Sequence, residues 1–352
     1  MHAIVPPYLL AALAAAPADR FPAASAAARA TLALPRTYTP TRAHLDLSVD
    51  GGALVVSASP DPDRLVSDAQ QREELPGVPA RAEGAEPTGD AAVDEAYDGL
   101  GATFAFFWQA FERVGLDAAG GPLLATVHFG RDYDNAFWDG TRMVFGDGDG
   151  EVFTGFTRSV SVIAHELAHG VIEHAGGLVY QGQSGALNES VADVFGALTE
   201  QHLRGETAGE ATWLVGAEIF TDAVTGSALR SLAAPGTAYD DDILGRDPQP
   251  GHMRDYVETS GDNGGVHINS GIPNKAFHLV ATTLGGNAWE RAGRIWYLTL
   301  TGGSLSSTAT FTDFAAATTA TAIAEYGEES EEAAAVRKAW DAVGVTGDVA
   351  VG

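Results

Sequence analysis

The stretch HELAHG, residues 165–170, is the feature that most constrains this chain. Its surroundings, SVSVIAHELAHGVIEHAGG, have apolar residues at helical spacing and end in two glycines, so we expect a helix that stops before Gly176. His165 and His169 are four residues apart and would share one face of that helix. Both imidazoles could then bind one metal ion, with Glu166 beside them, a pattern typical of zinc hydrolases.

A second stretch, GALNESVADVFG at residues 185–196, supplies the carboxylates that such a site needs. A catalytic zinc site has three protein ligands and one open position, and Glu189 offers the third ligand from another expected helix. Ligand histidines usually donate their second ring N–H to an oxygen, for which Asn188 and Asp193 are suitably placed. The alternative is a helix that carries two structural histidines by chance.

Composition limits the partners and the type of metal site. The 352 residues include 20 Lys and Arg against 47 Asp and Glu, a net charge of −27, which argues against nucleic acid and anionic membranes as partners. The chain has no Cys, so the metal must be bound by His and carboxylate. We find no apolar run long enough to span a bilayer. The first residues lack the basic region of a classical signal peptide, so we expect the protein to be cytoplasmic or exported by a non-classical route.

Residues 1 to about 63 differ from the rest in being rich in Ala and Pro, with turn signals at residues 50–52 and 60–62. A short helix is expected from Tyr8 to Ala16. The segment is either a poorly ordered tail or a propeptide. Residues 64–157 then combine one long amphipathic helix with strands, and residues 158–352 are mostly helical, which indicates an α+β protein.

A third group of residues lies in the Gly-rich run SGDNGGVHINSG, which we expect to be a loop. Asp262 precedes His267 by five residues. An Asp that binds one imidazole nitrogen leaves the other as a donor toward a developing oxyanion. Alone, this pair is more often structural, but beside a zinc site it favours a catalytic role.

The segments NAFW, HELAHG, GLVYQGQSGALNESVADVFG, ALRS and DNGGVHINSG closely resemble the thermolysin family of zinc metalloendopeptidases, and its short-precursor, protealysin-type branch in particular. The resemblance covers roughly residues 64–350. It implies a bilobal fold with a β-rich N-terminal lobe at 64–157, an α-helical C-terminal lobe at 158–352, and the zinc helix between them. It also implies a neutral endopeptidase as the activity.

The resemblance implies a role for each matching residue. His165, His169 and Glu189 would bind one zinc ion, and Glu166 would be the general base. Tyr180 and His267 would stabilise the oxyanion, with Asp262 orienting His267. Substrate main chain would be bound by Arg230, Asn135 and Ala136. The pocket for the residue after the scissile bond would be apolar and select a bulky hydrophobic side chain; its residues would be Phe153, Phe156, Val162, Val215, Ile219 and Leu229. Ordinary core packing is the alternative for these six.

Two further expectations follow from this resemblance. The family's double calcium site is poorly kept, because only Glu200 retains a carboxylate while Ser161, Thr212, Leu214 and Ala217 fill the other matching positions. Calcium is therefore unlikely there. IVPPYLL, residues 4–10, resembles the Pro-Pro motif of short propeptides, so residues 1–63 would block the cleft until they are removed autocatalytically.

The partners expected are protein or peptide substrates and the chain's own propeptide, and we expect a monomer. Three other classes compete with the endopeptidase. An aminopeptidase would need an acidic amine-binding motif, which is not evident. A catalytically dead binding protein would not need Glu166, Tyr180 and His267 together. A structural zinc protein would need four ligands, whereas the motifs supply three.

Overall fold

The computed structural model describes residues 2–34, 48–50, 53–55 and 61–345. Parts of the expected propeptide therefore lie outside the described residues, including the turn at 51–52 and the stretch just before the expected boundary at residue 63. Within the described ranges, none of the helices combines the length and apolar character needed to cross a membrane.

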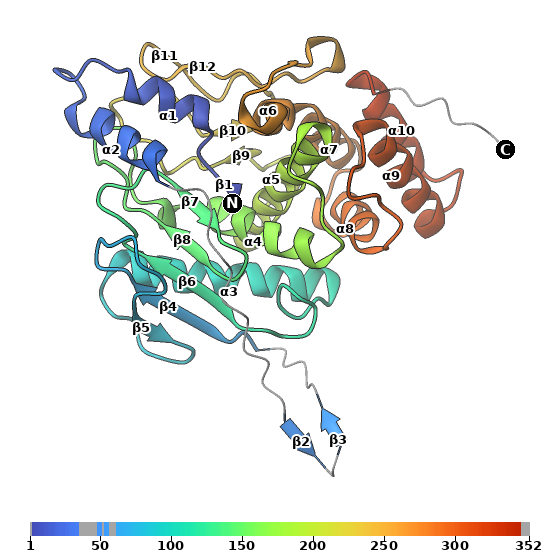
Figure 1. Ribbon diagram of the computed structural model, residues 1–352. Coiled ribbons are helices and arrows are strands. Elements are labelled where there is room, and N and C mark those ends of the chain that lie inside the picture. The colour runs from blue at the N-terminus through green and yellow to red at the C-terminus, as the bar shows by residue number, and fades with distance from the viewer. Residues whose placement is uncertain (1, 35–47, 51–52, 56–60, 346–352) are drawn as a thin grey trace.

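One sheet of six strands forms the N-terminal lobe (Figure 1). In spatial order its strands are β1 (His2–Ala3), β7 (Ala136–Trp138), β8 (Met143–Phe145), β6 (Leu123–Val127), β4 (Arg64–Asp68) and β5 (Val78–Ala82). The β4, β6 and β8 strands run parallel, while β1, β7 and β5 are antiparallel to their neighbours. The first strand of the chain thus completes the edge next to β7. A separate antiparallel pair is formed by β2 (Ser48–Asp50) and β3 (Ala53–Val55).

Helix α3 (Ala91–Phe111) packs against this sheet and begins at Asp90, whose side chain accepts from the amides of Ala92 and Val93. Such a cap satisfies amides that the first turn leaves unpaired. After the short 3₁₀ turn at Phe156–Arg158, the chain enters helix α4 (Val160–His174), which carries the HELAHG motif. Helix α5 (Gly182–Arg204) follows and packs along α4.

The C-terminal lobe is helical, so the expected α+β, bilobal architecture is confirmed (Figure 1). Its remaining helices are α6 (Asp262–Asn269), α7 (Gly271–Leu284), a π-turn at Trp289–Gly293, α8 (Arg294–Thr301), α9 (Phe311–Tyr326) and α10 (Glu331–Ala342), with a 3₁₀ turn at Met253–Asp255. Two short pairs, β9 (Leu214–Val215) with β10 (Arg230–Ser231) and β11 (Asp240–Asp241) with β12 (Gly245–Arg246), lie between α5 and α6 in the chain. Trp296 and Trp340 stack in the core of this lobe, with ring centroids 6.1 Å apart.

The N-terminal segment folds into two helices, α1 (Pro7–Ala14) and α2 (Pro22–Ala33), which pack against each other. A proline at the start of each helix supplies a preset φ where no N–H is needed. The α1 helix was expected from the sequence, and it buries Leu9, Leu10 and Leu13. The α2 helix was not expected, since its Ala-rich sequence lacks a clear apolar stripe.

Gly196 fixes how closely α4 and α5 approach. A Cβ atom there would lie 2.6 Å from the backbone oxygen of Ser161 on α4. We predict that Gly196→Ala destabilises the protein by about 1–3 kcal/mol, because the two helices would have to separate. Chemical denaturation measures the change. Gly209→Ala, where an added Cβ has nothing within 4 Å, is the matched control and should be near neutral. Equal stability of both variants would contradict this packing argument.

Candidate metal centre and active-site cleft

Helix α4 brings three functional side chains into the interior between the lobes. His165 and Glu166 are fully buried, and His169 is 1% exposed. The Nε2 atoms of His165 and His169 lie 3.1 Å apart, as the four-residue spacing on one helical face predicts. The two imidazole rings therefore converge on one point.

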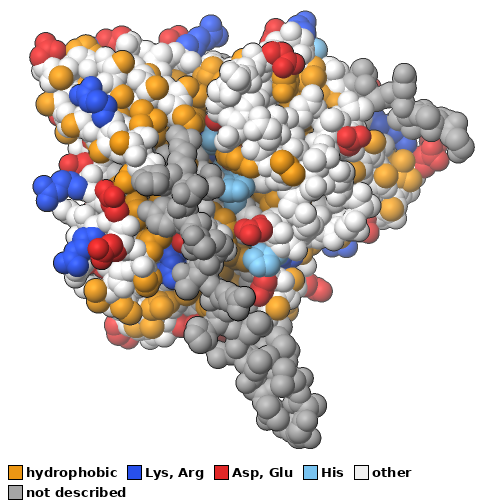
Figure 2. Space-filling view, viewed as in Figure 1, with side chains coloured by type: hydrophobic (Ala, Val, Ile, Leu, Met, Phe, Trp, Pro, Cys, Tyr) orange, Lys and Arg blue, Asp and Glu red, His pale blue; other side chains and the backbone are white. Residues whose placement is uncertain are grey.

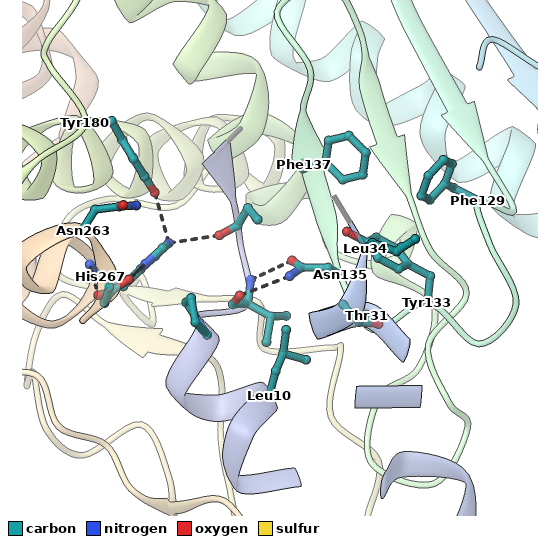
Figure 3. Close-up of a pocket in the computed structure, with 14 residues that line it drawn as sticks. Leu10, Thr31, Leu34, Phe129, Tyr133, Asn135, Phe137, Tyr180, Asn263 and His267 are labelled. Atoms are coloured by element: carbon teal, nitrogen blue, oxygen red, sulfur yellow. Dashed lines mark hydrogen bonds and ion pairs between the residues drawn. The ribbon is translucent and has the colours of Figure 1, made fainter. Parts of the chain in front are cut away.

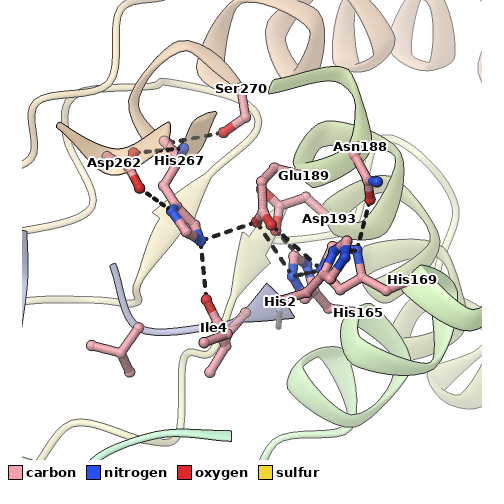
Figure 4. Close-up of polar contacts among 12 residues, drawn as sticks. His2, Ile4, His165, His169, Asn188, Glu189, Asp193, Asp262, His267 and Ser270 are labelled. Atoms are coloured by element: carbon pink, nitrogen blue, oxygen red, sulfur yellow. Dashed lines mark hydrogen bonds and ion pairs between the residues drawn. The ribbon is translucent and has the colours of Figure 1, made fainter. Parts of the chain in front are cut away.

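Glu189 on α5 completes a set of three ligands at that point (Figure 4). Its Oε2 lies 3.5 Å from Nε2 of His165, and its Oε1 lies 3.5 Å from Nε2 of His169. Ligands bound at about 2.0–2.1 Å around a tetrahedral zinc ion stand about 3.3–3.4 Å from one another. Two histidines and one carboxylate at these separations fit zinc without rearrangement of the helices.

The outer nitrogens of both histidines meet the two residues expected to orient them. Nδ1 of His169 donates to Oδ1 of Asn188 at 2.8 Å, and Oδ1 of Asp193 lies 2.9 Å from Nδ1 of His165. Both contacts turn Nε2 toward the ligand cluster. Burial by itself would raise the pKa of Asp193, but the adjacent Arg230 guanidinium and His165 outweigh it and hold the pKa below its usual range.

Glu166 lies next to the three ligands and faces strand β7. Its Oε2 accepts from the backbone amide of Trp138 at 2.9 Å. Burial, together with the negative charge of Glu189, raises the pKa of Glu166 well above its ordinary value. A strongly desolvated carboxylate with a raised pKa is suited to accept a proton.

His267 approaches the cluster from the opposite side of the cleft (Figure 4). The Gly-rich run at residues 260–271 is irregular where its glycines lie, since Asp262–Gly265 have positive φ, and it becomes right-handed helix at Val266–Asn269, the second half of α6. Gly264 and Gly265 adopt the left-handed conformation that leads into this turn of helix. Asp262 Oδ1 lies 2.6 Å from Nδ1 of His267, and the Tyr180 hydroxyl lies 3.2 Å from its Nε2. Tyr180 also donates to Glu189.

Both ring nitrogens of His267 face acceptors, since Nε2 donates to the carbonyl of Ala3 at 3.0 Å. Burial by itself would lower the pKa of His267, but Glu189 and Asp262 outweigh it, so the pKa lies above its ordinary value. The ring therefore directs its Nε2–H at the carbonyl oxygen of Ala3, next to the ligand cluster.

The backbone of residues 3–5 is bound in the cleft by the residues expected to bind substrate (Figure 3). The amide of Ile4 donates to the carbonyl of Ala136 at 3.1 Å, and Arg230 Nη1 donates to the carbonyl of Ile4 at 3.0 Å. The Asn135 amide forms a pair of bonds with Val5, accepting from its N–H at 2.9 Å and donating to its carbonyl at 3.1 Å. Together with His267, these groups bind three consecutive residues of the chain's own N-terminus.

His2 is the residue at this site that sequence reasoning missed. Its ring lies between those of His169 and Tyr180, with centroids 4.3 Å and 4.2 Å away. Burial lowers the pKa of His2 to about 3, so the ring is neutral. A lone histidine before the Pro-Pro motif, in a chain with ten histidines, gave no signal of this position.

The six apolar residues expected to line the pocket beyond the scissile bond are all buried. Backbone bonds bring several of them together: the amide of Leu229 donates to Val215, and the amide of Thr154, next to Phe153, donates to Ile219. None of these six lines the cavity in Figure 3, whose walls include Asn135, Tyr180 and His267 and, from the N-terminal segment, Val5, Leu10 and Thr31. The N-terminal segment thus forms one wall of the cleft.

Comparison with known proteins matches residues 78–173 to the thermolysin metallopeptidase catalytic domain and residues 176–345 to the thermolysin metallopeptidase alpha-helical domain. The chain is 54% identical over 282 residues to an extracellular metalloprotease of Pectobacterium carotovorum subsp. carotovorum, which covers 80% of this chain and 81% of that protein. It is 50% identical over 284 residues to protease PrtS of a Photorhabdus species, which covers 80% of this chain and 76% of that protein.

Among solved structures, the precursor of protealysin, a metalloproteinase from Serratia proteamaculans, is similar over nearly the whole chain. The TM-score is 0.88 at 46% sequence identity, over 98% of this chain and 100% of that one. Together with the two matched domains and the ligand geometry, these similarities confirm the resemblance read from the motifs. The chain belongs to the thermolysin family of zinc metalloendopeptidases.

Proposed function

We propose that this enzyme is made as a latent precursor, and that after release of its N-terminal segment it cleaves internal peptide bonds before bulky apolar residues. One observation carries the proposal. Strand β1 adds to the edge of β7 with His2 opposite Trp138 and Ala3 opposite Phe137, as an extended substrate would. While β1 occupies this edge, no other peptide can pair there.

The register of the bound segment supports a substrate-like arrangement. The Ala3 carbonyl accepts from His267, the Ile4 carbonyl from Arg230, and Val5 is paired with Asn135. The Ala3–Ile4 peptide bond therefore occupies the position of a scissile bond. Ile4 takes the place of the residue after the cut and is fully buried, which supports a preference for an apolar side chain there.

The roles of the chain's own residues follow from these positions. Zinc held by His165, His169 and Glu189 would supply the Lewis acidity that activates water and polarises the carbonyl. Glu166 takes the proton of the attacking water and delivers it to the leaving amine. His267 and Tyr180 donate hydrogen bonds to the developing oxyanion, and loss of one such donor typically costs about 2.7–4 kcal/mol of transition-state stabilisation.

Contacts away from the cleft keep the N-terminal segment in place. Glu151 accepts from the amides of Ala23 and Ala24 at 2.9 and 3.0 Å, and so caps the start of α2 from the catalytic domain. Near the other end of α2, Thr31 Oγ1 accepts from the amide of Asp134 at 3.1 Å. These bonds add to the burial of α1 and support residues 2–34 as part of an inhibitory propeptide.

Peptides and proteins are the substrates that this cleft suits, since it presents backbone donors and acceptors on one side and an apolar pocket on the other. Nucleic acid is not a suitable partner for a chain with a net charge of −27. On the face shown in Figure 2, the described Lys and Arg side chains are interspersed with acidic ones rather than gathered in a patch.

We also propose that the family's double calcium site is not used here. Glu200, the carboxylate that remains, pairs with Arg204 at 2.6 Å, and the same guanidinium nitrogen lies 2.9 Å from Glu218. Ser161 accepts from the amide of Gly216 at 3.2 Å instead of offering a carboxylate. The Arg204 guanidinium therefore already neutralises Glu200 and Glu218, as a calcium ion would.

We predict that added calcium leaves the melting temperature unchanged to within about 2 °C, because a ligand stabilises a protein only when it binds the folded state more tightly than the unfolded state. A titration followed by differential scanning calorimetry checks this, with potassium chloride at matched ionic strength as the control. A rise of many degrees, specific to calcium, would contradict the proposal.

The proposed latency can be tested on the folded, full-length protein. A recognition site for a specific protease is placed between residues 56 and 60, Glu166→Gln serves as the inactive control, and an internally quenched peptide with an apolar residue in its middle is the substrate. Cutting should raise activity about 100-fold or more, since the edge of β7 becomes available. Mass spectrometry should place the cut before the apolar residue.

No gain in activity after complete cutting and removal of the segment would contradict an inhibitory propeptide. Release of single residues from the peptide's N-terminus would instead indicate an aminopeptidase. Activity absent both before and after cutting, with zinc bound, would favour the catalytically dead binding protein.

A further inference from the structure

The His2 ring reaches the metal centre itself. One ligand atom each from His2, His169 and Glu189 lies within 4.8 Å of the others (Figure 4). We propose that in the precursor His2 is a fourth protein ligand of the catalytic zinc ion, and that it leaves with the N-terminal segment on activation. This inference rests on the proposed function and assigns a ligand that the motifs do not contain.

The position of His2 is fixed by the backbone on both sides of the cleft. Strand β1 pairs with β7, and the carbonyls of Ala3 and Ile4 accept from His267 and Arg230. A slip of one residue along β7 would turn the His2 side chain to the other face of the strand and break both carbonyl bonds. The same bonds that hold the segment therefore direct the imidazole toward His169 and Glu189.

The His2 ring lies between two residues of the site, His169 and Tyr180, and one of its nitrogens lies within 4.8 Å of a ligand atom of Glu189. Imidazole nitrogen is a common zinc donor, and three such nitrogens with one carboxylate make a closed four-ligand set. A second interpretation is a ring that only packs on its neighbours, and the experiment below distinguishes the two.

A closed set of ligands would keep the bound segment from being cut. The Ala3–Ile4 bond lies in the scissile position, with His267 donating to its carbonyl and Glu166 nearby. Catalytic zinc sites keep one position open, and structural sites have none. With His2 in that position, no water is available for Glu166 to activate, so the bound segment is an inhibitor rather than a substrate.

The test counts imidazole ligands in the full-length protein. Glu166→Gln is present in every sample to prevent self-cleavage, and zinc is replaced by cobalt for visible spectroscopy, with X-ray absorption on the zinc form. We expect three imidazoles bound to the metal in the precursor and two after His2→Ala. The cobalt spectrum should change, and the zinc affinity, measured by chelator competition, should fall about 10-fold or more. The control is His174→Ala, which replaces an exposed histidine on α4, the helix that carries His165 and His169. Its imidazole count, cobalt spectrum and zinc affinity should equal those of the parent.

Hydrogen exchange at the Ile4 and Val5 amides shows whether the segment stays in the cleft when His2 is replaced, because both amides donate to the catalytic domain. Two imidazoles in parent and His2→Ala alike, with those amides protected, would overturn the inference and leave the proposed function intact. Failure of every sample to bind stoichiometric metal would instead contradict the proposed function itself.

Discussion

The buried carboxylate of Asp193 joins the parts of this enzyme that must act together. It contacts the zinc ligand His165 on α4, accepts from Arg230 on β10 at 2.8–3.0 Å, and accepts from Asn274 on α7 at 2.8 Å. Asp193 and Asn274 are fully buried, and Arg230 is 1% exposed. Removing one partner from a buried ion pair typically costs about 3–5 kcal/mol, because the other charge is left uncompensated. Metal binding and substrate binding therefore depend on one shared charge.

The edge of β7 explains how a short N-terminal segment can control this site. An uncovered edge strand offers unpaired backbone groups, which bind any extended peptide. In the precursor, the chain's own β1 satisfies that edge, and α1 and α2 bury apolar side chains beside it. Recognition of substrate and inhibition by the propeptide are thus two uses of one surface. In our proposal the difference between them is His2, which occupies the open position of the zinc ion in the precursor and is absent when a substrate is bound.

Much of the site was predictable from local sequence. Helical spacing alone brought His165 and His169 together, and the motif that contains Glu189 also contained Asn188 and Asp193, because all three lie on one helix. The convergence of Asp262, His267 and Tyr180 on the same point depends on tertiary packing and came from the family resemblance. The sequence run around His267 was interpreted as a loop. Its glycines are indeed non-helical, and the helical turn at Val266–Asn269 that follows them was not expected.

What local sequence could not reveal was long-range pairing. His2 carries no pattern of its own, and its place at the metal centre depends on a strand of two residues pairing with β7, more than a hundred residues away. Similarly, α2 has a weakly patterned, Ala-rich sequence, and its interaction with Glu151 is visible only in the folded chain. Interactions of this kind are set by the shape of the catalytic domain rather than by the segment itself.

The most direct test of this account is a time course of intact mass on the purified full-length protein, with and without a zinc chelator, alongside Glu166→Ala. The account predicts that the wild-type protein loses its N-terminal segment, while both the chelator and the substitution prevent the loss. Loss of the segment at the same rate in all three samples would contradict it, since the cut would then be made by something other than this zinc site.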